Sequence, residues 1–251
     1  MGTPDKQQAP PSASYRLLGV ARKGNAFEET VEHLLRGFRL GLFPPGGRLP
    51  PERELAEELG VSRATLRDAL AELQKAGYLT IQRGRYGGAM VATELPTRGA
   101  VLDSGDLELV EDVLTFRAVV EPAAAALAAR AALTAAQRNG LLDTLRAVSA
   151  AGPGQYRPLD ARLHIAIAEL TASPRLAAAV AEARAATSDL LDRIPFLAPN
   201  IEHSDVQHQA IIEAILAGDP EQARGLMAEH LEGTAALLRG FLASGDIRTG
   251  A

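Results

Sequence analysis

The chain has 251 residues, of which 47% are hydrophobic and 23% charged, and its formal net charge is −5 at pH 7. This apolar fraction is enough for a packed core in one or two domains. The absence of cysteine excludes disulfide scaffolds, iron–sulfur clusters, thiolate zinc sites and cysteine catalysis. The sequence has neither a secretory signal nor an apolar run that spans a bilayer, so we expect a cytoplasmic protein.

Charge is distributed unevenly along the chain. Residues 1–99 carry a balance of +3, whereas residues 100–251 carry −8. A nucleic acid responds to the local field of a protein, so the acidic average does not exclude it as a partner of the first part. The asymmetry favours two parts with different partners.

The residue pattern of the first part predicts a small helical module that ends in a hairpin. Apolar residues recur at helical spacing from Phe27 to Leu40, and Gly60 and Gly77 are suited to end two further helices. Ser62 is a plausible N-cap for the third helix. In chain order we expect a disordered tail at 1–24 and a module at 25–92, with helices at 27–40, 51–60 and 63–76 and strands at 78–82 and 89–92.

The second part is helical in pattern throughout. Turn-forming residues without a period at 93–106 predict an interdomain linker. Glycine and proline clusters then separate the apolar stripes, and no strand pattern occurs. We expect an antiparallel all-α bundle at 107–244, with helices near 107–132, 134–150, 156–172, 174–193, 203–217 and 220–243.

Helix, glycine turn, helix and a two-stranded wing form the pattern of a winged helix-turn-helix. In the third helix the buried stripe leaves Arg63, Thr65 and Arg67 projecting from its N-terminal half, where a recognition helix meets base edges. The alternative is that the arginines are solvated charges paired with Asp68 or Glu72.

The stretch from Leu49 to Val91 closely resembles the DNA-binding domain of GntR-family transcription regulators. It has that family's LP-x-ERELA segment, a VSR turn and a G-G-x-x-V wing strand, and its departures, such as Pro51 for Ser and Met90 for Phe, remove no DNA contact. The resemblance implies that DNA is contacted by Arg53, Ser62, Arg63, Thr65, Arg67, Arg83 and Gly84.

Histidine is scarce, and three of the five histidines occupy inward-facing stripes of the second part. Asp160 and His164 stand one helical turn apart, while His208 and His230 lie on later helices. Three imidazoles and one carboxylate suit Zn²⁺, Ni²⁺ or Mn²⁺. The alternative for each is a buried histidine that bonds a backbone carbonyl. We expect His33 on the polar side of its helix.

The second part looks like the FCD effector domain of the FadR-type branch of GntR regulators. It carries R-x-x-x-E-P-x-A-A from Arg117, D-x-x-x-H from Asp160, H-x-x-I-x-x-A-I-x-x-G-D from His208 and A-x-x-x-M-x-x-H-L from Ala223. The one departure is Leu163, where Phe is usual. The resemblance implies a metal ion held by Asp160, His164, His208 and His230, with a small organic acid bound beside it.

Arg117 lies on an apolar stripe, and a buried guanidinium requires an anion. Glu121, one turn on, is one candidate, and a ligand carboxylate is the other, which the resemblance favours. Ser204, one turn before His208, is a second candidate for contact with the effector.

Together these patterns predict a mostly α protein that is not an enzyme. We expect a homodimer that binds a palindromic double-stranded operator, with repression relieved by a small carboxylate at the metal site. Two alternatives remain at this point. In one the metal ion itself is the effector, and in the other the His₃Asp centre activates water as a hydrolase.

Overall fold

A computed structural model describes residue 21 and residues 23–82, 88–96 and 104–242. The chain divides into two compact units. The first comprises residues 1–102 and 239–251, and the second comprises residues 103–238. Most of the predicted tail and the wing-tip residues Arg83 and Gly84 lie outside the described residues.

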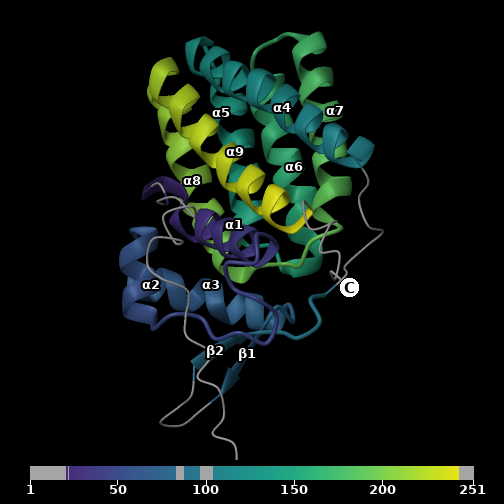
Figure 1. Cartoon of the computed structure of the whole chain (residues 1–251). Helices are drawn as coiled ribbons and strands as arrows, with labels where there is room; N and C mark the ends of the chain where they lie inside the picture. Colours follow the sequence, from purple (N-terminus) through teal and green to yellow (C-terminus); the bar gives the residue numbers. More distant parts are fainter. Residues whose placement is uncertain (1–20, 22, 83–87, 97–103, 243–251) are drawn as a thin grey trace, which may run out of the picture. The chain divides into compact units, whose positions relative to one another are not determined.

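The first unit contains three helices and a hairpin (Figure 1). After a short 3-10 turn at Lys23–Asn25, these elements are α1 (Ala26–Arg39), α2 (Glu52–Leu59), α3 (Arg63–Lys75), β1 (Leu79–Gln82) and β2 (Gly88–Val91). The strands are antiparallel, with Leu79 opposite Val91, and an isolated bridge joins Arg48 to Met90. This is the predicted winged helix-turn-helix arrangement.

The turn between α2 and α3 is built from two local signals. Gly60 ends α2 in the left-handed conformation, at φ 69°, which glycine adopts without steric cost. The Ser62 hydroxyl then caps α3 by accepting a hydrogen bond from the Thr65 N–H at 3.0 Å. Leu66 and Leu73 of α3 are buried, as their spacing predicts. The opposite face of α3 is therefore left to solvent.

The polar side of α1, on which His33 is predicted to lie, is buried as well. The His33 side chain is buried, and so are Glu28 and Glu29 on the same helix. The apolar stripe of α1 indicates one buried face only, whereas the folded unit also encloses part of the polar face. Periodicity alone cannot reveal such a second contact.

The second unit is a helical bundle (Figure 1). Its helices are α4 (Ser104–Arg130), α5 (Ala135–Ser149), α6 (Pro153–Glu169), α7 (Pro174–Leu191), α8 (Ala198–Ala217) and α9 (Pro220–Leu242), the last of which runs into the residues grouped with the first unit. The mostly α fold class, with a winged N-terminal module and a helical C-terminal part, is confirmed.

Three helices begin earlier than the sequence pattern predicts. Helix α4 starts at Ser104, inside the predicted linker, α6 starts at Pro153, and α8 starts at Ala198. In α6 and α8 a proline occupies the first turn. Proline is compatible with that turn because the first N–H groups of a helix have no intrahelical partner. A proline read as a break is here the start of a helix.

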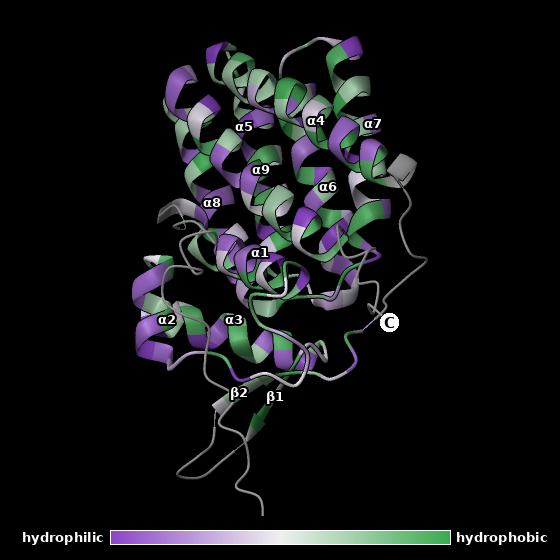
Figure 2. Cartoon of the chain, in the orientation of Figure 1, coloured by the Kyte–Doolittle hydropathy of each residue, from purple (hydrophilic) through white to green (hydrophobic). Residues whose placement is uncertain are grey.

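The core of the bundle is made of aliphatic side chains and alanines. Leu163, Ile167, Ile211 and Met227 are buried together from α6, α8 and α9, and small residues such as Ala125 pack among them. Figure 2 shows green and purple residues alternating around these helices, as expected for helices with one buried face. Among the described residues, no helix is both long and apolar enough to cross a membrane.

Candidate metal centre and DNA-binding helix

Four potential metal ligands from three helices meet in the core of the second unit. Asp160 and His164 come from α6, His208 from α8 and His230 from α9, and all four are buried. One ligand atom of each lies within 4.8 Å of all the others. The sequence positions predicted as a set are therefore brought together by the fold.

The distances fit the coordination shell of a metal ion. His208 Nε2 lies 3.2 Å from His230 Nε2 and 3.2 Å from Asp160 Oδ1, and His164 Nε2 lies 3.8 Å from the same oxygen. Ligands at zinc–nitrogen bond lengths stand roughly 3.3 Å apart in a tetrahedron. His164 Nε2 is buried and has no hydrogen-bond partner in the part of the chain that the structure describes. A bound ion would satisfy it.

The protonation states also suit a metal. Burial lowers the pKa of His164 and lowers that of His230 well below its ordinary value, so both rings are neutral near pH 7. Burial alone would raise the pKa of Asp160, but Arg184 and the histidines outweigh it and hold that pKa well below normal. Metal ions bind neutral imidazoles and ionised carboxylates. Such an ion, when bound, would act as a Lewis acid toward oxygen atoms of a further ligand.

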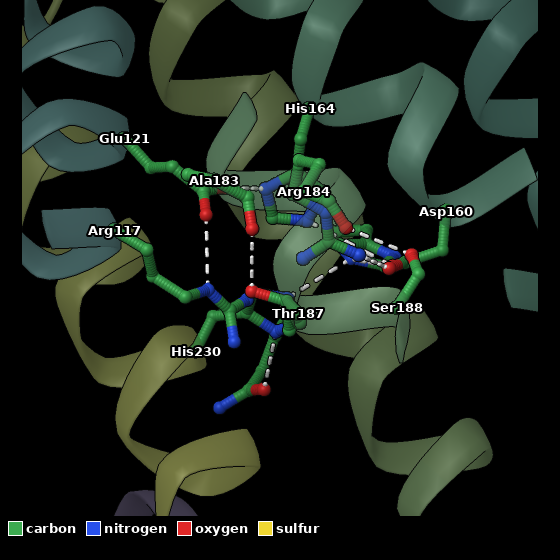
Figure 3. Close-up of polar contacts among 11 residues, drawn as sticks. Arg117, Glu121, Asp160, His164, Ala183, Arg184, Thr187, Ser188 and His230 are labelled. Atoms are coloured by element: carbon green, nitrogen blue, oxygen red, sulfur yellow. Dashed lines mark hydrogen bonds and ion pairs between the residues drawn. The ribbon is translucent and has the colours of Figure 1, made fainter. Parts of the chain in front are cut away.

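The outer nitrogens of two rings are held by further side chains. His164 Nδ1 contacts the Glu121 carboxylate, as Figure 3 shows, and His230 Nδ1 lies 3.0 Å from Gln207 Oε1. His208 Nδ1 has no partner among the described residues. Outer partners of this kind fix which ring nitrogen faces the ion. Neither Glu121, in this role, nor Gln207 was predicted from the sequence.

Arg117 makes the contact that the sequence offered as one of two alternatives. Its Nε donates to Glu121 Oε1 at 2.9 Å, and both side chains are only 1% exposed. Its Nη1 and Nη2 are buried and have no partner among the described residues. Glu121 therefore uses only part of the donor capacity of Arg117, and two nitrogens remain for an anion.

Arg184 of α7 is a second buried arginine that sequence reasoning missed. It donates to Asp160 Oδ2, and 2% of its surface is exposed. The sequence indicates it only weakly, as a single arginine among alanines. Arg184 lies on the same face of α7 as Val180, Ala183 and Thr187, and all four are buried. Arg184 compensates the charge of Asp160 and leaves Oδ1 directed at the histidines.

A cavity of about 40 Å³ adjoins the cluster. Asp160, Arg184 and His230 line it, together with Tyr156 and the predicted effector residue Ser204. Arg117 does not line it. A volume of this size holds about three water molecules, since one needs roughly 10–15 Å³. A larger ligand therefore requires side chains to move.

In the first unit, the predicted base-reading residues lie at the exposed start of α3. Ser62, Arg63 and Arg67 are exposed, and Thr65 is half-buried with its hydroxyl 2.8 Å from that of Ser62. Arg63 forms no ion pair within the described residues. Its guanidinium is free to contact an anionic partner.

The other arginines of this surface are paired, but not as the alternative reading predicts. Arg67 donates to Glu52 at 2.6 Å rather than to Asp68 or Glu72, and Arg53 donates to Glu57 at 3.2 Å. These pairs are exposed to solvent. Exposed pairs contribute at most about 1 kcal/mol, so DNA phosphates or bases can displace the carboxylates at low cost.

A larger cavity, of about 370 Å³, lies beside Arg67 in the same unit. Arg48, Glu52 and Gly88 are among the residues that line it. Arg48 was not singled out in the sequence. Its bridge to Met90 positions it at the base of the wing, close to the helix expected to read DNA.

Two families match this chain in consecutive segments. Residues 27–87 match the family described as bacterial regulatory proteins, gntR family, and residues 112–233 match the FCD domain. The first segment contains α1 to α3 and β1, and the second contains all four residues of the buried cluster.

Relatives similar over most of their length are also transcriptional regulators. RmpR of Mycobacterium gastri, named as an HTH-type transcriptional regulator, is 32% identical over 239 residues, which are 92% of this chain and 84% of that protein. The Uxu operon transcriptional regulator of Escherichia coli is 28% identical over 82% of this chain and 83% of its own length.

Among solved structures, a GntR family member from Pseudomonas syringae pv. tomato is similar over 92% of this chain and 97% of its own, with 20% identity and a TM-score of 0.47. The relatives in sequence and the N-terminal family model are both those of transcriptional regulators. The hydrolase alternative is thereby removed. The chain belongs to the GntR family of bacterial transcriptional regulators, in the branch that carries a C-terminal FCD domain.

Proposed function

We propose that this regulator is a metal-containing repressor that a small carboxylate releases from its operator. The observation that carries this proposal is the convergence of three imidazole Nε2 atoms and the Asp160 carboxylate in the FCD domain. The ligands are Asp160, His164, His208 and His230, and the ion is Zn²⁺, Ni²⁺ or Mn²⁺. The affinity of the DNA-binding module for the operator is then the property that the effector changes.

At the DNA, Arg63 and Arg67 read base edges in the major groove from the start of α3. Thr65 and Ser62 lie beside them, and Arg53 contacts a phosphate. Arg83 and Gly84 at the wing tip complete the set by resemblance to the family. A homodimer positions two such surfaces on the half-sites of a palindrome.

The effector is a small organic acid. The ion held by the four ligands would act as a Lewis acid toward its carboxylate, and the two nitrogens of Arg117 that have no partner among the described residues would bind the same anion, while Ser204 lies in the wall of the adjoining cavity. One relative, 32% identical over 200 residues, is named for the L-lactate dehydrogenase operon of Escherichia coli. That name supports an acid of this class as the signal.

A second candidate is a sensor in which the metal ion itself is the effector. The observation in its favour is the cavity of about 40 Å³, which holds water but no organic acid unless side chains move. Calorimetry on metal-stripped and metal-loaded protein separates the two. The proposed function requires heat from an organic acid with the metal-loaded form, whereas operator affinity that changes with metal alone supports the sensor.

DNA recognition is tested with Arg63→Ala and Arg67→Ala in gel shifts on an operator selected from a random library. We expect specific binding to be lost, because each substitution removes a donor to base edges worth about 1–3 kcal/mol or more. Arg146→Ala is the matched control, since Arg146 is exposed on α5 and, among the described residues, forms an ion pair only with Asp143. Unchanged gel shifts for both α3 variants would refute the assignment.

A further inference from the structure

Glu121 is a buried carboxylate whose two oxygens have different partners. Oε1 accepts a hydrogen bond from Arg117 Nε at 2.9 Å, and Oε2 contacts His164 Nδ1 (Figure 3). Only 1% of the side chain is exposed. Glu121 is therefore not available as a metal ligand, yet it touches one of the four residues that are.

The contact with Glu121 determines which nitrogen of His164 carries the proton. An ionised carboxylate accepts hydrogen bonds and cannot donate one. Arg117 Nε, which is as deeply buried as Glu121, donates to the other oxygen of this carboxylate and favours its ionised form. The proton of a neutral His164 ring is consequently on Nδ1, and the lone pair on Nε2 faces Asp160 and the other histidines.

The other two histidines lack such an anchor. The amide of Gln207 beside His230 Nδ1 accepts through oxygen but donates through nitrogen, so it tolerates either tautomer. His208 Nδ1 has no partner in the described part of the chain. Among the three rings, His164 alone has a charged acceptor at its Nδ1 atom in these residues.

We propose that Glu121 is a positioning residue of the metal centre, which fixes the tautomer and orientation of His164 while Arg117 fixes Glu121. This inference rests on the proposed metal site and deepens it. It also connects Arg117, which is proposed to bind the effector, to the metal ligand His164 through the single carboxylate of Glu121. The competing explanation is that Glu121 only neutralises the charge of Arg117 and has no influence on the metal.

Zinc affinity distinguishes these explanations. Glu121→Gln keeps the shape of the side chain but removes the charged acceptor, and we expect its zinc dissociation constant, measured by competition with a chelator, to rise about 10- to 100-fold. Glu169→Gln is the matched control, because Glu169 is an exposed carboxylate on α6 whose one ion-pair partner within the described ranges is Arg162. Its zinc affinity stays at the wild-type value.

A second readout follows the tautomer of His164 directly. Nitrogen-15 NMR of the imidazole rings in metal-free wild-type protein is expected to show His164 protonated at Nδ1, and Glu121→Gln is expected to populate the Nε2–H form. Protonation of the wild-type ring at Nε2 overturns the inference. So does an affinity of Glu121→Gln for zinc within about twofold of wild type. Failure of wild-type protein to bind zinc, nickel or manganese instead contradicts the proposed function.

Discussion

At the residue scale, the arrangement around the cluster depends on two buried arginines with separate tasks. Arg184 holds Oδ2 of Asp160, and Arg117 holds Oε1 of Glu121. Each guanidinium keeps a carboxylate ionised, and each carboxylate then meets an imidazole. A buried pair of this kind adds little net stability, but removal of one partner leaves an uncompensated charge.

Replacing Arg184 with alanine is therefore expected to destabilise the metal-free protein by about 3–5 kcal/mol, because Asp160 loses its nearest cation. Urea unfolding measures the loss against Arg146→Ala, a surface variant. Saturating zinc restores part of the stability, since the ion replaces the guanidinium as the partner of Asp160. A metal-free Arg184→Ala protein as stable as the surface variant would contradict this role.

Some of these residues were predictable from the sequence and others were not. The three histidines stand out because they are rare and occupy apolar stripes, and Asp160 stands out because it precedes His164 by one turn. Arg184 gives only a weak signal within its alanine-rich helix. Its pairing with Asp160, like that of Glu121 with His164, joins residues far apart in the chain and appears only when the helices pack.

At the element scale, the helices and the hairpin follow from local signals. The glycine at position 60, the cap at Ser62 and the apolar stripe of α3 specify the helix-turn-helix without reference to distant residues. Helix starts were less predictable. A proline marks both a break between helices and the first turn of a helix, and Pro153 and Pro199 stand in first turns. The burial of His33 depends on packing and was missed.

His33 makes the stability of the first unit depend on pH. Burial, followed by Arg36, lowers its pKa below 6.5, with Glu29 opposing. The unfolded chain consequently binds more protons than the folded chain below about pH 6.5, and stability falls as the pH decreases. We expect wild-type protein to lose more unfolding free energy than His33→Gln between pH 7.5 and 5.5. Equal losses in urea titrations would show that His33 makes no such contribution.

At the scale of the whole molecule, the uneven charge corresponds to two structural units with different chemistry. The unit that contains α1 to α3 exposes arginines on its predicted DNA-reading helix, whereas the bundle buries Arg117, Glu121, Asp160 and Arg184 around the cluster. Membership of the GntR family accounts for both, since one part binds DNA and the FCD domain binds the effector. The lack of cysteine excludes thiolate ligands only, and the centre proposed here uses nitrogen and oxygen.

The central claim is that the three histidines and Asp160 together bind one divalent metal ion. Elemental analysis of protein dialysed against buffered zinc tests it most directly, with His203→Ala as the control because His203 lies on α8 outside the cluster. The account predicts about one zinc per chain in wild-type protein and in His203→Ala, and almost none in folded His208→Ala. Full zinc occupancy in folded His208→Ala would contradict it, and so would wild-type protein that takes up none of zinc, nickel and manganese when dialysed against each.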